Sequence, residues 1–306
     1  MELDFMATSV RRALLCICVA VSVAAGLSIA VSACKAAPPS PLVRQVEARR
    51  VAAELRLTFT RAADASNRAV MADTDEASIA FAAEAEQAKA VVKSDADALD
   101  PLLRGLDYAE EAQTLDEFRK HFGDYDALDR NVLALAVENT NLKAQQLSFG
   151  PARDAANAFR TALDAVASAA AQKARCEVES RVAAAGAAVL AVQVLYAPHI
   201  AESHDAAMSA MEHEMDAHLA VARASLDKLS SDATPTSRAA LAAAGAALER
   251  FAATHAQIIA LSRKNSNVPS LALALGDKRA LASACDAKLT ALGDALGKRE
   301  ITTATR

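Results

Sequence analysis

The chain has 306 residues, a formal net charge of −5 and 53% hydrophobic residues, whereas aromatic residues make up 4% and tryptophan is absent. Much of the hydrophobic content is alanine, the best helix former and a poor filler of cores, so the composition favours closely packed helices over a β-rich core. No basic block follows the first residues, which argues against a protein that binds the phosphate backbone of nucleic acids.

The amino-terminal region has the pattern of a targeting segment rather than of a folded domain. Arg11 and Arg12 precede an apolar run over residues 13–33, a pattern typical of an export signal or a membrane anchor. The run ends in "VSAC", which resembles the lipobox of bacterial lipoproteins and implies that Cys34 is lipidated. The alternative is an uncleaved transmembrane helix, since the run is long enough to span a membrane. Both readings predict a membrane-anchored protein of the bacterial cell envelope that faces the periplasm or the exterior.

Helical periodicity begins near Leu42, and hardly any strand alternation follows. Thr74 or Asp75 can cap a second helix. Thr114 and Glu117 form a capping box that predicts the start of a third. We predict helices over residues 42–71, 76–103 and 114–138, then one from residue 142 that Gly150 and Pro151 kink and that runs unbroken through residues 154–197.

The second half of the chain repeats this scheme. Pro198 is expected to start a helix, Ser237 or Thr234 to cap the next, and Pro269 to lie in the first turn of the last. The apolar stretch Val182–Ile200 is long enough to raise the alternative of a second membrane span, but its place in the repeat favours a buried helix. The predicted helices cover residues 178–197, 198–229, 237–264 and 268 onward.

These elements predict an all-α fold of two tandem antiparallel four-helix bundles that share a long connecting helix. The expected parts are a signal peptide or anchor (1–33), a linker (34–41), a first module (42–172), a second module (173–300) and a disordered tail (301–306).

One stretch of sequence occurs twice. Residues 137–153 and 263–279 align without a gap at a constant offset of 126, with identical residues in the pairs Asn139 and Asn265, Asn141 and Asn267, Leu147 and Leu273, Gly150 and Gly276, Arg153 and Arg279. Asparagine tolerates the left-handed conformation that ends helices and can also cap the next one. We therefore expect a helix–turn–helix joint in each copy and a duplicated module.

The first copy, within "VLALAVENTNLKAQQLSFGPARDAANAFRTAL", resembles the sensory four-helix bundle of bacterial methyl-accepting chemotaxis proteins. The residues that carry the resemblance are Asn139, Asn141, Lys143, Ala144, Leu147, Gly150, Ala152 and Arg153. The second copy departs from it, with Pro269 and Ser270 in place of the Lys and Ala. The resemblance implies a sensor domain that binds a small-molecule ligand and pairs as a homodimer.

The family's long cytoplasmic signalling hairpin has no counterpart in the chain, so a signal is expected to pass to a separate chemoreceptor or kinase. Arg153 and Arg279 are the candidate ligand-binding residues, since a guanidinium can clamp a carboxylate. The alternative is that each arginine only packs its stem against a neighbouring helix.

A second candidate site is a seam of His204, Met208, Met211, Met215 and His218, whose spacing places them on one helical face. Such a seam could hold copper or haem as cofactor, or simply fill a core. No nucleotide-binding, hydrolase or redox motif is present, so no catalytic residue is expected and we do not predict an enzyme. We expect a non-enzymatic sensory or ligand-binding lipoprotein; the alternatives are a periplasmic metal- or haem-binding bundle and a structural envelope lipoprotein.

Overall fold

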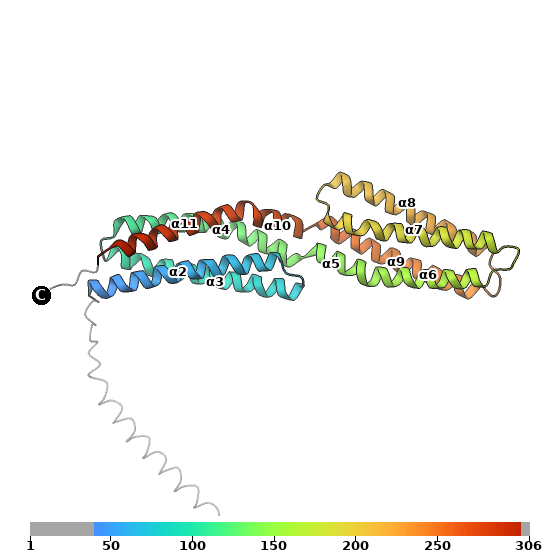
Figure 1. Ribbon diagram of the computed structural model, residues 1–306, viewed down its shortest axis with the longest axis horizontal. Helices are drawn as coiled ribbons and strands as arrows, with labels where there is room; N and C mark the ends of the chain where they lie inside the picture. The colour runs from blue at the N-terminus through green and yellow to red at the C-terminus, as the bar shows by residue number, and fades with distance from the viewer. Residues whose placement is uncertain (1–39, 301–306) are drawn as a thin grey trace, which may run out of the picture. The chain divides into compact units, whose positions relative to one another are not determined.

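The computed structural model describes residues 40–300, and all the regular structure among them is helical (Figure 1). The predictions for residues 1–33, for Cys34 and for the tail 301–306 lie outside the described residues. Residues from Gln45 onward form one compact unit; of the other unit only the start of the first helix is described. Four single helices are α2 (Pro41–Val70), α3 (Asp75–Arg104), α7 (Arg175–Ala201) and α8 (Asp205–Ser231).

Two further helices, each about 60 residues long, are bent and are each interrupted twice. The first bent helix consists of α4 (Ala109–Glu138), α5 (Thr140–Leu147), the π-helical turn η1 (Ser148–Ala152) and α6 (Arg153–Ser168). The second consists of α9 (Arg238–Lys264), α10 (Asn267–Leu275) and α11 (Asp277–Lys298).

Most predicted helix ends agree with the structure, and the misses have local causes. Thr74 is the N-cap of α3, and its side chain accepts a hydrogen bond from the Ala77 amide at 3.1 Å. The capping box at Thr114 is wrong, because Thr114 lies inside α4 and its hydroxyl donates to the Glu110 carbonyl. Pro198 does not start a helix, because it lies in the last turns of α7.

The predicted unbroken helix through residues 154–197 is also wrong. Helix α6 ends at Ser168 and α7 begins at Arg175. Residues 171–177 are all exposed. Most helical stability in proteins comes from packing of an apolar face, so an alanine-rich stretch with nothing to pack against gives way to a turn even without glycine or proline.

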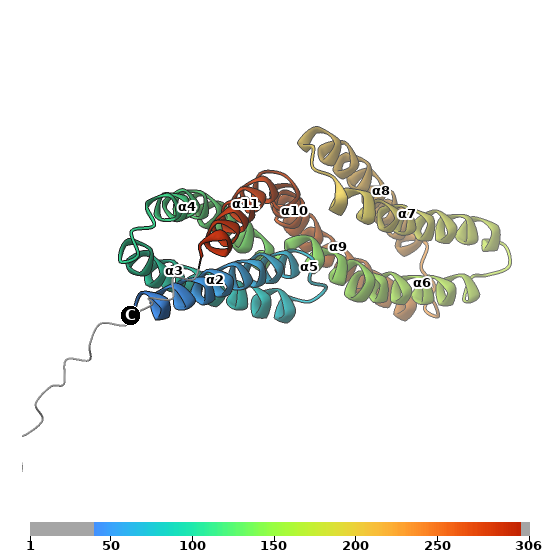
Figure 2. The same ribbon diagram turned by 60° about the vertical axis from the view of Figure 1, so that its left-hand side comes forward.

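The helices pack as bundles around two main apolar cores (Figures 1 and 2). The first core draws its residues from α2, α3, α4 and α11, and the second from α5, η1, α6, α7, α8 and α9. The predicted module boundary, between residues 172 and 173, falls between α6 and α7, which both contribute to the second core. The first bent helix leaves the first core and enters the second, and the second bent helix returns in the opposite sense.

The region where the two bent helices pass each other, residues 139–141 and 265–267, is called the joint below. Asn139 and Asn265 are in the left-handed conformation, with φ of 52° and 51°, which confirms the role predicted for them. They do not form hairpin turns, however. Each marks a bend from which the next helical segment continues into the other core.

Hydrogen bonds at the joint are reciprocal between positions 126 apart. The Asn141 amide N–H donates to Asn267 Oδ1 (3.0 Å), and the Asn267 N–H donates to Asn141 Oδ1 (3.2 Å). The Thr140 and Ser266 hydroxyls likewise each accept the other's backbone N–H at 3.0 Å. Such self-complementary pairing is the pattern of a two-fold contact, here formed inside one chain.

The side-chain amides extend this pairing to other helices. Asn141 Nδ2 donates to Asn265 Oδ1 at 2.8 Å and to the carbonyl of Ile200 in α7 at 2.6 Å. Asn267 Nδ2 donates to Asn139 Oδ1 at 2.6 Å. The joint therefore fixes the two bent helices to each other and to the end of α7.

Helix α7 is long and apolar enough to cross a membrane by length and composition alone. Several of its residues, among them Ala185, Val189 and Val192, are buried in the second core. Its opposite face leaves Leu190 and Val194 largely exposed.

Asn141→Ala should lower the free energy of unfolding by roughly 2–4 kcal/mol. The substitution leaves the Ile200 carbonyl and the Asn267 N–H without partners, and a buried orphaned group costs about 1–3 kcal/mol. Urea denaturation followed by circular dichroism measures the loss. Asn157→Ala, at an exposed position of α6, is the matched control. An equal loss in both variants would contradict a special role for the joint.

Replacement of Asn265 by glycine and by alanine separates backbone strain from hydrogen bonding. Both variants lose the same side-chain bonds, but only alanine is strained at a φ of 51°. We expect the glycine variant to be more stable by about 1 kcal/mol. At Ala256, an exposed position within α9, glycine should instead be less stable than alanine by about 1 kcal/mol. The same sign at both positions would refute the strain argument.

Candidate functional site

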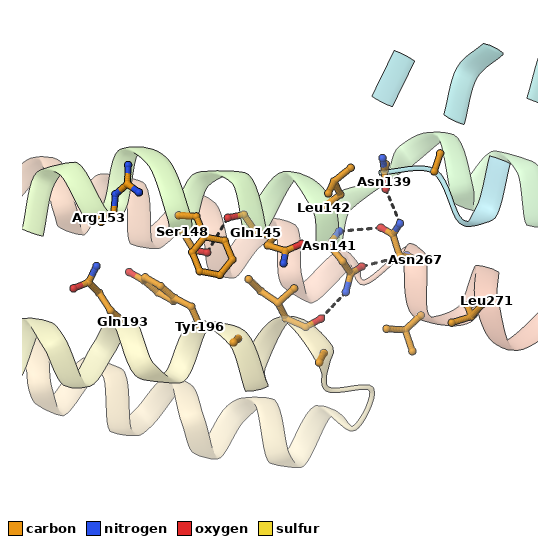
Figure 3. A pocket seen from close by; sticks show the side chains of 16 residues that line it. Asn139, Asn141, Leu142, Gln145, Ser148, Arg153, Gln193, Tyr196, Asn267 and Leu271 are labelled. Atoms are coloured by element: carbon orange, nitrogen blue, oxygen red, sulfur yellow. Dashed lines mark hydrogen bonds between the residues drawn. The ribbon is translucent and has the colours of Figure 1, made fainter. Parts of the chain in front are cut away.

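A cavity of about 510 Å³ lies beside the joint and is called the joint cavity (Figure 3). Its size falls in the range of small-molecule sites. The walls come from the first bent helix, from α7 and from the start of α10. Its polar lining comprises the amides of Asn139, Asn141, Gln145, Gln193 and Asn267, the hydroxyls of Ser148 and Tyr196, and the guanidinium of Arg153; no aspartate or glutamate lines it.

The π-helical turn η1 shapes one wall of the joint cavity. Gly150 and Pro151 were expected to kink the helix; they lie in η1, where Pro151 has no backbone N–H to donate. π-Turns within α-helices are frequent at functional sites. Here the turn carries Phe149, which lines the cavity yet remains 61% exposed, and it leads directly into Arg153.

Tyr196 lines the cavity and carries a hydroxyl that is buried and unsatisfied. Its side chain is 2% exposed, and its hydroxyl has no hydrogen-bond partner among the described residues. In Figure 3 the ring points into the space between α7 and the first bent helix, with the hydroxyl on the side of Gln193. Burial raises the pKa of the phenol, so the hydroxyl stays protonated and able to donate.

The two arginines predicted as ligand-binding residues line different cavities. Arg153 lines the joint cavity, where its side chain is 60% exposed and its guanidinium lies 3.2 Å from the carboxylate of the neighbouring Asp154. Arg279 lines a second cavity of about 330 Å³ between α2, α10 and α11. No ion pair or hydrogen bond holds the Arg279 side chain among residues 40–300, so its charge is free to meet an anion. The structure does not bring the two side chains together.

The His–Met seam is not assembled as predicted. His204 precedes α8, its side chain is 82% exposed, and its Nδ1 lies 2.7 Å from Glu202 Oε1. Met208 and Met215 are buried, Met211 is half-buried against the second core, and His218 lies at the surface of α8 beside Glu214. Within the described part of the chain, no three or more His, Cys, Asp or Glu side chains are grouped as metal ligands.

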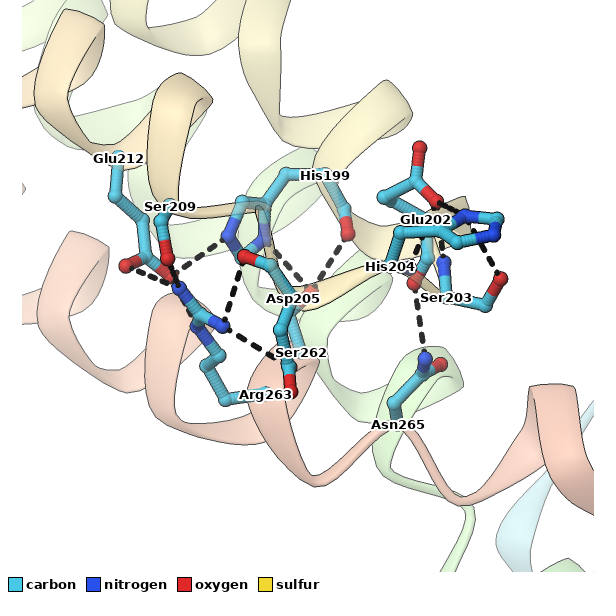
Figure 4. Close-up of polar contacts among 10 residues, drawn as sticks. All are labelled: His199, Glu202, Ser203, His204, Asp205, Ser209, Glu212, Ser262, Arg263 and Asn265. Carbon is cyan, nitrogen blue, oxygen red and sulfur yellow. Dashed lines mark hydrogen bonds and ion pairs between the residues drawn. The ribbon is translucent and has the colours of Figure 1, made fainter. Parts of the chain in front are cut away.

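A different histidine lies at the centre of a polar cluster at the ends of α7 and α9 (Figure 4). The fully buried His199 places Nδ1 2.8 Å from Ser262 Oγ and Nε2 2.9 Å from Glu212 Oε1. Arg263 holds the same carboxylate through two hydrogen bonds of 2.6 and 2.8 Å. The bond from Arg263 is the main reason that the pKa of Glu212 lies below its usual value.

The order serine–histidine–carboxylate is reminiscent of a hydrolase triad, but the geometry serves another purpose. The Ser262 hydroxyl donates back to the His199 carbonyl at 3.0 Å, and neither side chain lines the joint cavity. The next two residues, Ile200 and Ala201, do line it. The cluster therefore fixes the end of α7 that closes the cavity.

A second buried network lies in the part of the chain built around the first core. Lys89 Nζ lies 2.9 Å from Asp129 Oδ2 and 2.6 Å from Glu86 Oε1. Lys278 Nζ lies 3.2 Å from the other Asp129 oxygen and donates to Ser66 Oγ at 2.5 Å. Asp129 therefore serves two buried ammonium groups at once.

The two lysines respond to burial in opposite ways. Desolvation lowers the pKa of Lys278, since Asp129 is its only carboxylate partner and Lys89 carries a like charge nearby. Desolvation acts on Lys89 as well, but its ion pairs with Glu86, Asp129 and Asp126 outweigh the burial and raise its pKa.

The sequence singled out Arg153, which lines the joint cavity, but not Tyr196 or His199. A signal was available, because Gln193, Tyr196 and His199 are the polar side chains of the mostly apolar stretch 182–200, and polar groups buried in a helix interface need partners.

Comparison with known proteins adds no relative: the chain matches no protein-family model, no curated protein and no solved structure.

Asp129→Asn should destabilise the protein by about 3–5 kcal/mol, because it removes the carboxylate shared by two buried ammonium groups. Lys278→Met alone should cost far less, since Asp129 keeps Lys89. The double variant should recover most of the loss, and its departure from additivity measures the coupling. Urea denaturation of the single and double variants gives the values. Additive losses would show that the two groups act independently.

Proposed function

We propose that this protein is a non-enzymatic ligand-binding protein of the cell envelope whose ligand occupies the joint cavity. The observation that carries the proposal is a cavity of small-molecule size in which one buried hydroxyl, that of Tyr196, lacks a partner while the cation Arg153 stands at the wall. A ligand carboxylate satisfies Arg153, and an acceptor group on the ligand satisfies the Tyr196 hydroxyl once the atoms that cover it move aside. The absence of acidic residues from the lining favours an anion.

The place of the cavity suits a sensor. Its walls belong to both bent helices and to α7, so a bound ligand contacts elements from each half of the chain. We infer two antiparallel four-helix-bundle modules, similar to the sensory bundles of chemotaxis receptors, with the joint between them. A ligand that alters the packing at the joint would shift the bent helices, and small helix shifts are a common means of signal transmission.

The remaining parts of the proposal rest on the sequence. Residues 1–33 would export or anchor the protein, and Cys34 would carry lipid, so that the helices face the periplasm or the exterior. The chain would act as a homodimer or through a separate membrane receptor or kinase.

A thermal-shift screen tests the proposal. The protein used begins at Lys35, which retains every described helix and both cores, and the probes are amino acids and carboxylates from acetate to dodecanoate. A ligand at about 100 times its dissociation constant stabilises the folded state by about 2.7 kcal/mol. Arg153→Ala should abolish the stabilisation and Tyr196→Phe should reduce it.

Arg160→Ala is the matched control, since Arg160 lies on the same helix and outside the joint cavity. It should leave the ligand response unchanged. Equal responses in the Arg153 and Arg160 variants, or no response to any carboxylate, would refute binding in the joint cavity. A response confined to Cu²⁺ or haem would favour the His–Met alternative.

A further inference from the structure

The joint cavity and the Arg279 cavity are neighbours. Leu271 lines both of them, and the adjacent residues Met71 and Ala72 line one each. We call the combined feature the joint groove. Cavities of about 510 and 330 Å³ on two sides of one leucine offer room for a ligand longer than either cavity holds alone.

The middle of the joint groove is apolar and open to solvent. Four of its large apolar side chains are 43–77% exposed, namely Met71, Phe149, Leu271 and Leu275. Single exposed apolar residues are common on protein surfaces, but several that line adjoining cavities indicate a binding surface. The four residues come from three separate segments of the chain, so only the folded joint assembles them.

The charged residues of the joint groove are all basic. Arg153 stands at one end and Arg279 at the other, while no aspartate or glutamate lines either cavity. Lys278 contributes only its stem, because its ammonium is directed to Asp129 and Ser66. The other cavities described are different: each includes an acidic residue such as Asp294, Glu177 or Asp154. The groove therefore complements an anion with a long apolar part.

We propose that the ligand class is a long-chain aliphatic carboxylate, with its carboxylate at Arg153 and its hydrocarbon chain extending past Leu271 towards Met71 and Leu275. This inference rests on the proposed function and narrows it. Along the first bent helix, Gln145 is eight residues, about 12 Å, from Arg153. Figure 3 shows Leu271 beyond Gln145, at the opposite end of the cavity from Arg153, so a short acid held at Arg153 does not reach Leu271. The apolar length of the ligand should therefore determine affinity.

A homologous series of straight-chain carboxylates from butanoate to tetradecanoate tests this directly. Isothermal titration calorimetry on the protein from Lys35 onward should show affinity rising about fourfold for each added methylene until the groove is filled. Dodecanol and dodecyltrimethylammonium match dodecanoate in apolar length. They should bind at least tenfold more weakly, because only the carboxylate meets Arg153.

Two leucines provide matched variants. Leu271→Asn should weaken dodecanoate binding by about tenfold or more and leave butanoate unchanged. Leu190→Asn, at an exposed position of α7 outside both cavities, should leave the series unchanged. Both sites are partly exposed, so neither variant removes a core residue.

The outcomes separate the inference from the proposed function. Carboxylate binding that depends on Arg153 but not on chain length overturns the long-chain ligand and keeps the joint cavity as the site. Equal binding of dodecanoate and dodecyltrimethylammonium overturns the role of charge. No binding of any carboxylate overturns both proposals.

Discussion

Reciprocal amide hydrogen bonds between residues 139–141 and 265–267 are the interaction on which the rest of the structure depends. Each bent helix passes from one core to the other, so neither core is completed by one half of the chain. The joint holds the two bent helices in register. The backbone N–H groups at the bend of one helix donate to side-chain oxygens at the equivalent positions of the other helix. Buried backbone groups need such partners, and a bend without them would be costly.

The cavity follows from the same construction. A helix that bends cannot keep the next helix at constant distance, and the first bent helix also carries a π-turn directly after the joint. Asn141 ties the end of α7 to the joint, and the His199 cluster holds it from the other side. The space enclosed between these fixed points is therefore part of the architecture rather than a packing fault.

The sequence alone could predict the helices, but not that two of them pass from one core to the other. Periodicity and the caps located α2 and α3 within one or two residues, and the asparagine offset of 126 predicted the left-handed residues. A left-handed asparagine suits a hairpin as well as a bend, however, and only the partner across the joint decides between them. The break at residues 169–174 was missed for a related reason, since it results from a lack of contacts rather than from a helix-breaking residue. A repeated motif led to the prediction of Arg153, whereas the burial of Tyr196 and the partners of His199 depend on residues distant in the sequence.

Equivalent places in the two halves have diverged in chemistry while keeping their backbone. At the repeat's offset of 126, Asp129 corresponds to His255 and Lys278 to the fully buried Ala152. Beside the first core, Asp129 forms ion pairs with both Lys89 and Lys278, so neither lysine ammonium is free to bind a ligand. Around the second core, the Tyr196 ring stacks on His255 at 5.8 Å and its hydroxyl stays unpaired. Burial lowers the pKa of His255, so this stacked pair is uncharged at neutral pH. The Tyr125 hydroxyl in the first core is also buried without a partner among the described residues, but Tyr125 lines none of the cavities described. Tyr196 lines the joint cavity together with Arg153, which is why the carboxylate is expected to bind there.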